Sequence, residues 1–384
     1  MARNPFKFLD SFEKADKDRF FGRDKETGQL FNAVHASNLV LVYGGSGTGK
    51  TSLVMCGLAN QFHDTDWLPL LVRRSSNINK SLQDQLATAV ILNQNGQEGE
   101  GGHPSETARK IINYRNREGQ SIPAMIQDLY FRVYRPVYLI FDQFEELYIM
   151  GSHEEQAEFH ETVKELLSAR LQCKILIIIR EEYIAYLSEF EKIVPPLFDN
   201  RLRIEKMNDR NLAKVITGTA RYGGIRIDDK QVTVPAILDN LRTRREGVDL
   251  TNLQVYMDRL WRRDAKRQGA TTDEEIEALD QIVFDPELIE KVGPMQNVLS
   301  LFLDEQMQQV EEGLRARGLK KPEGIPLEVL FTLVTEDGTK RNMTPESILA
   351  DLPPNRRISE DQLEYCLDEF YRIRLLRRFG EEVE

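Results

Sequence analysis

The sequence predicts an α/β fold, with a parallel β-sheet core in the N-terminal half followed by helical regions. The run at 136–141 is continuously apolar, and those at 38–43 and 173–179 are apolar apart from Asn38 and Lys174. Such runs are typical of strands covered on both faces of a parallel sheet. A glycine-rich loop follows the first run, and a helical pattern follows that loop. From residue 208 onward the apolar residues recur mainly with helical spacing. A short run at 199–204 is expected to complete the sheet.

The glycine-rich loop fits the pattern G-x-x-x-x-G-K-[ST] of a phosphate-binding P-loop. It comprises Gly44, Gly45, Ser46, Gly47, Thr48, Gly49, Lys50 and Thr51, with Ser52 directly after it. The glycines allow backbone N–H groups to surround a triphosphate, and the helix N-terminus adds partial positive charge. We expect Lys50 to reach the β- and γ-phosphates and the Thr51 hydroxyl to ligate Mg²⁺. The predicted ligands are therefore ATP or ADP with Mg²⁺.

The second apolar run ends in acidic residues, which is the second feature that a P-loop protein needs. Asp142 follows the run directly, at the strand end where open α/β sheets bind their ligands. We expect Asp142 to hold the Mg²⁺ shell through water. A glutamate just beyond it would orient or deprotonate the attacking water. Glu145 is favoured for that role, and Glu146 stays a candidate.

The third apolar run ends at Arg180. A cation at the tip of a strand beside the acidic one would face the γ-phosphate, where it could sense that group or stabilise the transition state. The alternative is an ion pair between Arg180 and a nearby glutamate, such as Glu145, Glu146, Glu181 or Glu182. The two roles are compatible, because such a pair could itself be the switch.

Four motifs together resemble the STAND NTPases, which are signal-transducing ATPases related to AAA+ proteins. Residues 20–26 resemble the hhGRxxE element of that family, and residues 4–12 resemble the N-terminal edge of its bacterial "novel STAND" subgroup. The acidic segment 142–147 and the segment 180–183 resemble two further family motifs. The resemblance implies that the nucleotide base is bordered by Phe21, Gly22 and Arg23.

The resemblance also implies three domains. These are a P-loop NTPase core at 1–205, a helical lid at 206–284 and a winged helix at 285–384. Within the core, residues 93–106 are too polar and glycine-rich to pack, so we expect a disordered insertion there. The family's lid carries a proline that contacts the nucleotide, and this chain departs from that pattern around Thr251 or Asn252. Thr251 would instead cap its helix.

The C-terminal segment fits a winged helix. Residues 325–334 read as an apolar helix, Thr344 caps a second helix with Pro345 at its first position, and 361–372 read as a third. Residues 373–379 fit a terminal strand. A basic face for DNA would draw on Arg356, Arg357, Arg372, Arg374, Arg377 and Arg378. Acidic residues crowd the same region, so an interdomain lever is favoured over DNA binding.

Composition limits the remaining possibilities. The chain has 62 acidic and 51 basic residues, a formal charge of −11, which disfavours non-specific DNA binding. It contains 41% hydrophobic residues, yet no apolar run approaches the roughly 18 residues that span a bilayer. The three cysteines are widely separated in apolar patterns, which favours buried thiols in a reducing cytoplasm. No histidine or cysteine cluster has metal-ligand spacing.

These observations predict an ATP-binding, slowly hydrolysing switch of the STAND class that couples nucleotide state to conformation and assembly. Signalling or defence is the expected context. Its partners would be ATP and either further copies of the chain or a separate effector or sensor protein. Two alternatives stay open. One is a DNA-associated AAA+ initiator or loader, and the other is a nucleotide-binding scaffold without significant turnover.

Overall fold

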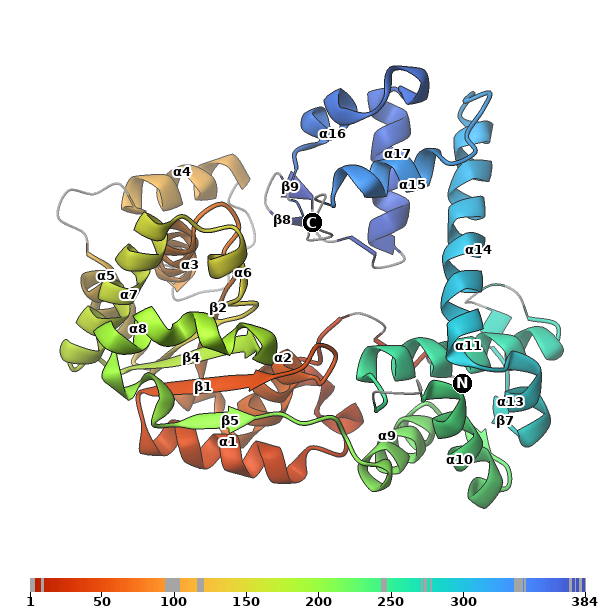
Figure 1. The fold of residues 1–384 in the computed structure, drawn as a ribbon, viewed down its shortest axis with the longest axis horizontal. Coiled ribbons are helices and arrows are strands. Elements are labelled where there is room, and N and C mark those ends of the chain that lie inside the picture. Colours follow the sequence, from red (N-terminus) through yellow and green to blue (C-terminus); the bar gives the residue numbers. More distant parts are fainter. Residues whose placement is uncertain are drawn as a thin grey trace. The chain divides into compact units, whose positions relative to one another are not determined.

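The computed structural model describes residues 4–7, 10–93, 104–115, 121–242, 247–270, 272, 275–276, 278–334, 341, 343–372, 375–376, 378–379 and 382–383. The chain forms two compact units, one of Ser11–Val215 and one of Met1–Asp10 with Ile216–Glu384 (Figure 1). Most of the insertion predicted at 93–106 lies outside the described residues. Its last three residues instead begin helix α4, Pro104–Arg115, so the expected disorder does not extend over them.

The first unit is built on a five-stranded sheet in which all paired strands are parallel. Its strands are β1 (Leu39–Gly44), β2 (Leu68–Val72), β3 (Val137–Phe141), β4 (Cys173–Arg180) and β5 (Arg201–Arg203). Their order is β2-β3-β4-β1-β5, so β4 lies between the P-loop strand and the acidic strand. Gly44 is in register with Arg180, which brings the carboxyl ends of the strands to one edge.

This sheet confirms the predicted α/β class and the predicted strands β1, β3, β4 and β5. Strand β2 was not predicted from the sequence. β2 is an edge strand and contains Pro69. Proline cannot donate a ladder hydrogen bond, so within sheets it occurs mainly in edge strands. Arg73 and Arg74 directly follow β2, so they lie at the same carboxyl ends of the strands as Asp142 and Arg180.

Helices cover both faces of the sheet, as the continuous apolar strands require. One face packs against α1 (Asp24–Ala36) and the helix after the P-loop, and its core includes Leu30, Val34 and Leu58. The other face packs against α3 (Ile78–Leu92), α5 (Ile122–Val133), α7 (His153–Ser168) and α8 (Ser188–Ile193). Figure 1 shows these helices on opposite sides of the strands. Each fully buried side chain of this size contributes about 1.5–3 kcal/mol to folding.

The helix after the P-loop departs from regular α geometry. It begins as α2 (Lys50–Ser52), widens into the π-helix η2 (Leu53–Leu58) and tightens into the 3₁₀-helix η3 (Ala59–Gln61). π-turns of this kind occur often at functional sites. At Gly57 a Cβ atom would lie 2.7 Å from Thr27 Oγ1 and 3.0 Å from Phe20 Cε1. The helix therefore packs closely against segment 20–27, and a larger residue at this point would force the Thr27 side chain to move.

The second unit begins with helices and a short parallel pair of strands. Its first elements are α9 (Asp209–Tyr222), which crosses the division, β6 (Arg226–Ile227), α10 (Lys230–Leu241), α11 (Leu250–Arg267), β7 (Val283–Phe284) and α13 (Pro286–Val292). The N-cap of α11 is Asp249, whose carboxylate accepts a hydrogen bond from Thr251 N at 2.8 Å. The expected Thr251 cap is therefore wrong. An aspartate two residues earlier satisfies the helix N-terminus, because its short carboxylate reaches the N2 amide.

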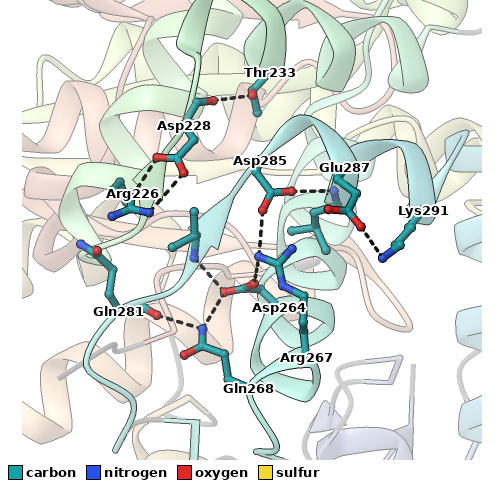
Figure 2. A network of polar contacts seen from close by, with 12 residues as sticks. Arg226, Asp228, Thr233, Asp264, Arg267, Gln268, Gln281, Asp285, Glu287 and Lys291 are labelled. Atoms are coloured by element: carbon teal, nitrogen blue, oxygen red, sulfur yellow. Dashed lines mark hydrogen bonds and ion pairs between the residues drawn. The ribbon is translucent and has the colours of Figure 1, made fainter.

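A buried carboxylate holds α11, β7 and α13 together (Figure 2). Asp264 accepts hydrogen bonds from Val283 N and Gln268 Nε2, both at 2.8 Å, and it pairs with Arg267 at 2.6 Å. Arg267 also pairs with Asp285 at 2.9 Å, and Asp285 caps α13 by accepting from Leu288 N. Although burial raises the pKa of Asp285, its bonds to Arg267 and Leu288 N prevail and lower it. This network fixes the three elements to one another.

The C-terminal part of the second unit contains α14 (Met295–Ala316), α15 (Ile325–Thr332), α16 (Pro345–Asp351), α17 (Glu360–Arg372) and the antiparallel pair β8 (Arg378–Phe379) and β9 (Glu382–Val383). Val310, Val329, Ile348 and Phe370 belong to one buried cluster that joins its helices. Thr344 caps α16, as predicted, by accepting from Ser347 N. Residues 373–374 and 377 of the predicted terminal strand lie outside the described residues. The winged-helix assignment and the three-domain boundaries stay predictions.

Candidate nucleotide-binding site

The predicted site residues lie at the carboxyl edge of the sheet in the first unit. The P-loop follows β1, Asp142 follows β3, and Arg180 ends β4. Arg73, which sequence reasoning did not single out, follows β2. Ligands of open α/β sheets bind at this edge, because loops there leave the core and helix N-termini point toward it. The topology therefore brings residues from four strands to one place.

The P-loop has the backbone geometry of a cradle. Gly47 and Gly49 have φ values of 66° and 82°, in the left-handed region that favours glycine. A Cβ atom at Gly44 would lie 2.2 Å from the Ile204 carbonyl oxygen, so the chain after β5 packs directly against the start of the loop. Within the described part of the chain, no backbone N–H of residues 46–49 donates a hydrogen bond. These donors fit an anion with several oxygens.

Lys50 lies back over the loop. Its Nζ donates hydrogen bonds to the carbonyl oxygens of Gly44 and Gly45, both at 2.9 Å. Burial lowers the pKa of Lys50, and the nearby Arg180 lowers it further, whereas Glu145 and Asp142 raise it. The ammonium group is thus placed near two carboxylates and the loop amides.

Thr51 and Asp142 are in direct contact. The Thr51 hydroxyl donates to Asp142 Oδ1 at 2.7 Å. The other carboxylate oxygen, Oδ2, accepts from Arg73 at 2.8 Å and 3.2 Å. Asp142 is only 3% exposed, so its charge is balanced mainly by the side chains that touch it. A hydroxyl beside a carboxylate is a donor set that suits Mg²⁺.

Glu145 and Arg180 form an ion pair at the same edge. Arg180 Nε lies 3.0 Å from Glu145 Oε1, and the Arg180 backbone N–H donates to Oε2 at 3.1 Å. Glu145 is buried, whereas the Arg180 side chain is 45% exposed. Glu146 begins the short helix α6 (Glu146–Ile149), after a turn at Gln143 with φ of 56°. Of the two predicted glutamates, Glu145 is therefore the one joined to Arg180.

The residues expected near the nucleotide base lie beside the P-loop. Arg23 is buried and donates to the carbonyl oxygens of Thr48 and Glu205 at 2.8 Å and 2.9 Å, and it pairs with Glu26. A Cβ atom at Gly22 would lie 3.0 Å from the Asn211 carbonyl oxygen, so segment 207–215 packs against it. Phe21 is half-buried. Contact of these residues with a base stays a prediction.

Ser52 and Thr48 have structural hydrogen bonds. Ser52 Oγ accepts from Phe12 N at 3.0 Å, and Thr48 Oγ1 donates to the Gly45 carbonyl at 3.0 Å. These bonds shape the loop and tie it to the preceding segment. The residues present thus fit a nucleoside triphosphate with Mg²⁺. Lys50 and the loop amides would hold the phosphates, and Thr51 and Asp142 would hold the metal, whose chemistry is to neutralise developing phosphate charge.

Other kinds of site are not visible in the described residues. There, no group of three or more histidine, cysteine or acidic side chains could hold a metal. Cys56, Cys173 and Cys366 are buried and form no disulfide, as predicted, and burial raises the pKa of Cys173 to about 12. Among the helices that the structure describes, none combines the length and apolar character needed to cross a membrane.

Arg73 carried a sequence signal that could have revealed it. An apolar segment at 68–72 is followed directly by two arginines, the same arrangement that pointed to Asp142 and Arg180. Pro69 makes the segment a weaker strand signal, because proline is depleted in strands. Its position in the sheet became visible only when the strand was paired with β3.

Comparison with solved structures yields several similar chains. The Walker-type ATPase PABY2304 of Pyrococcus abyssi has a TM-score of 0.49 and 15% identity, with 99% of this chain and 96% of that chain covered. The ORC2 protein of Aeropyrum pernix, in its ADPNP–ADP complexes, has a TM-score of 0.49 and 15% identity over 99% and 92% of the two chains. The ORC1 protein of Aeropyrum pernix in complex with DNA has a TM-score of 0.45 and 15% identity over 95% and 88%.

No curated protein matches the chain. A family model described as Novel STAND NTPase 1 matches residues 5–284, well over half of the sequence. That range contains the P-loop, Asp142, Glu145 and Arg180, so the match includes the motifs that first suggested the resemblance. This chain therefore belongs to the Novel STAND NTPase 1 family and is a P-loop NTPase.

Proposed function

We propose that this protein is an ATP-dependent switch that hydrolyses ATP slowly and couples nucleotide state to conformation and assembly. The observation that carries the proposal is the meeting of Lys50, Asp142, Glu145 and Arg180 at one edge of the sheet. Lys50 and Asp142 would hold the Mg²⁺-nucleotide. The Glu145–Arg180 ion pair would respond to the γ-phosphate.

The ion pair between Glu145 and Arg180 supports a switch because Glu145 is the proposed catalytic base and the pair occupies its carboxylate. Both Glu145 oxygens contact Arg180, one through the guanidinium and one through the backbone N–H. A γ-phosphate would attract the half-exposed guanidinium and weaken its pair with Glu145. The carboxylate would then be able to orient a water molecule. Such a rearrangement is a two-state element whose balance shifts by the difference in affinity of ADP and ATP for its states.

The proposed cellular role rests on the family to which the chain belongs. We place the protein in the cytoplasm, in signalling or defence. Its partners would be further copies of itself or a separate effector or sensor protein. The free energy that drives assembly would come from ATP binding, and slow hydrolysis would limit the lifetime of the assembled state.

A lysine substitution tests the site. Lys50→Ala should reduce ATP and ADP affinity at least about a hundredfold, because a buried cation that faces the phosphates is lost. Lys174→Ala is the matched control. Lys174 is also partly buried, but it lies on β4 near the opposite edge of the sheet, where it donates to the Ser37 carbonyl. Nucleotide affinity should be measured by calorimetry for both variants and for the wild type.

Three outcomes of this experiment are distinguishable. Unchanged affinity in Lys50→Ala would contradict the site assignment. Strong binding with no phosphate release over many hours would favour the scaffold without turnover. Loss of binding in Lys50→Ala alone, with slow phosphate release by the wild type, is the result expected of the switch.

One observation favours a second candidate function, a DNA-associated ATPase. Helix α11 places Arg259, Arg262, Arg263 and Lys266 on one face, where they line a groove of about 290 Å³ together with Gln308, Gln309 and Glu312 of α14. Arg262 pairs with Asp258 at 2.9 Å. Two arginines of the predicted C-terminal basic face also have partners. Arg372 pairs with Glu369, and Arg356 donates to the Glu323 carbonyl. We expect any contact with DNA phosphates on α11, because four basic side chains gather along one groove there.

Salt dependence tests this candidate. Duplex DNA should be titrated with wild-type protein and with the double variant Arg263→Glu and Lys266→Glu at several salt concentrations. Binding that falls steeply with salt and is lost in the variant would favour the DNA-associated ATPase. Weak binding that does not differ between the two proteins is the outcome expected of a switch without DNA.

A further inference from the structure

Two consecutive arginines follow strand β2 and contact two different buried carboxylates. Arg73 contacts Asp142 Oδ2 through Nε and a terminal nitrogen, at 3.2 Å and 2.8 Å. Arg74 contacts both oxygens of Glu155, at 3.0 Å and 2.8 Å. Both arginines are largely buried, and both pairs lie within the first unit. The chain therefore contains two similar ion pairs side by side, only one of which involves the predicted metal site.

The Arg74 pair has a structural explanation. Glu155 also accepts a hydrogen bond from Ile78 N at 2.7 Å, at the start of α3, and Arg74 donates to the carbonyl oxygens of Ser75 and Ser76. Glu155 belongs to α7. These contacts join the loop after β2 to two helices that cover the sheet. No group of this pair is a predicted ligand of nucleotide or metal.

The Arg73 pair has a different setting, because Asp142 faces the predicted Mg²⁺ position. Its Oδ1 accepts from Thr51, so Arg73 and Thr51 together engage both oxygens of the carboxylate. A buried carboxylate without a neighbouring cation would repel a nearby triphosphate. The guanidinium provides a charge-assisted, forked contact, which is about twice as strong as a neutral hydrogen bond. It therefore does for Asp142 what a divalent cation would otherwise do.

We propose that Arg73 is a positioning residue that neutralises and orients Asp142 when Mg²⁺ is absent and competes with the metal for this carboxylate. This inference rests on the proposed nucleotide site. It gives the switch a metal-free state in which the phosphate site still tolerates a polyphosphate. The protein would consequently retain ADP after Mg²⁺ leaves, and its nucleotide affinity would depend only weakly on Mg²⁺.

The magnesium dependence of ADP affinity tests this role. The quantity to measure is the ratio of the ADP dissociation constant in EDTA to that in excess Mg²⁺, by calorimetry or with a fluorescent ADP analogue. In Arg73→Gln this ratio should rise at least about tenfold over the wild type, the effect expected for one charged hydrogen bond. The rise should come from weaker binding in EDTA, where Asp142 loses the cation that is hydrogen-bonded to it. Binding in Mg²⁺ should be equal or tighter.

Two further variants make the test specific. Arg74→Gln removes the neighbouring ion pair and should lower the unfolding temperature without changing the ratio. Arg73→Lys keeps the positive charge but loses the forked geometry, so its ratio should lie between those of the wild type and Arg73→Gln. If circular dichroism shows that Arg73→Gln does not fold, the ratio measured for Arg73→Lys decides the test.

The possible failures are distinguishable. If wild-type protein binds ADP and both Arg73 variants show the wild-type ratio, Arg73 has no role at the metal site. An equal rise in Arg74→Gln would also overturn the inference, because the effect would then come from the loop as a whole. If wild-type protein binds no nucleotide even with Mg²⁺, the proposed function itself fails, and this inference fails with it.

Discussion

At the scale of single residues, the acidic strand end shows why neighbouring glutamates differ. Asp142 and Glu145 are 3% and 4% exposed, and each is engaged by an arginine from an adjacent strand. Glu146 begins α6 and is half-buried. The sequence places Glu145 and Glu146 side by side, so spacing alone could not decide between them. The ion pair with Arg180 favours Glu145 as the water-orienting base.

Replacing one carboxylate oxygen of Glu145 with an amide nitrogen tests that role. Glu145→Gln should lower the rate of ATP hydrolysis about a hundredfold or more, because the amide cannot accept a proton from water. ATP affinity should stay within about threefold of the wild type, since Lys50 and the P-loop amides are unchanged. Glu146→Gln is the matched control and should hydrolyse ATP normally. The opposite pattern would assign the base to Glu146.

A buried histidine gives a second residue-scale prediction. His160 contacts the Tyr148 hydroxyl at 3.2 Å and stacks on Phe190. Burial lowers its pKa to about 4, against a partial opposing effect of Glu189 and Glu161. Because the folded pKa lies below the unfolded value of about 6.5, the unfolded state binds more protons between these values. Stability should therefore fall by up to about 3 kcal/mol as pH drops from about 6.5 toward 4.

His160→Gln isolates this contribution. Glutamine can still contact the Tyr148 hydroxyl but does not titrate in this range. The free energy of unfolding, measured by urea denaturation at a series of pH values, should change less between pH 6.5 and 4 in the variant than in the wild type. Parallel pH profiles for the two proteins would show that His160 does not titrate as proposed.

At the scale of elements, the P-loop is positioned by the close approach of its backbone to the chain that follows β5. β5 contributes only three residues, yet the chain after it reaches the first glycine of the loop. Arg23 joins the same region by contacting the Thr48 and Glu205 carbonyls. The loop is thus held from the β5 side by backbone packing and by one buried side chain. Rigid placement of this kind prepares the loop amides for an anion.

Two glycine substitutions test the packing. Gly44→Ala should lower the free energy of unfolding by at least about 2 kcal/mol, because the new Cβ overlaps a backbone oxygen that cannot rotate away. Gly28→Ala is the control, since Gly28 lies in α1 with no atom within 4 Å of a built Cβ. An exposed helical glycine changed to alanine should raise stability by up to about 1 kcal/mol. Equal effects at the two positions would contradict the close approach at Gly44.

At the scale of the whole molecule, the family match spans both compact units. It covers residues 5–284, whereas the first unit ends at Val215. The second unit is stabilised by the hydrogen-bond network of Asp264 and by its own C-terminal hydrophobic core. We infer that nucleotide state is converted into a change of association between chains. We propose that the departure from the family's proline pattern, around Thr251 or Asn252 in α11, weakens the lid contact and favours the assembled state.

Light scattering at matched protein concentration tests assembly. The protein with a non-hydrolysable ATP analogue should have a larger mass than the protein with ADP, through head-to-tail contacts between copies. Arg180→Ala should lose this difference while it still binds ADP, because the residue expected to detect the γ-phosphate is gone. A mass of 44.4 kDa with every nucleotide, despite clear ATP binding, would favour a monomeric switch that docks onto a separate effector.

The sequence by itself determined the features that depend on contiguous residues. Apolar runs predicted β1, β3 and β4, and the glycine and lysine spacing predicted the P-loop. These patterns are readable because strand burial and loop geometry act on adjacent positions. The same holds for the cap at Thr344, where one side chain serves an amide three residues later.

Only the tertiary structure decided which of these residues meet. Arg73 lies 69 residues before Asp142, and Arg180 lies 35 residues after Glu145, yet each pair is in contact. Those contacts depend on the strand order β2-β3-β4-β1-β5, which places strands from distant parts of the chain next to one another. Strand order results from the packing of helices over both faces of the sheet, and local residue patterns do not encode it.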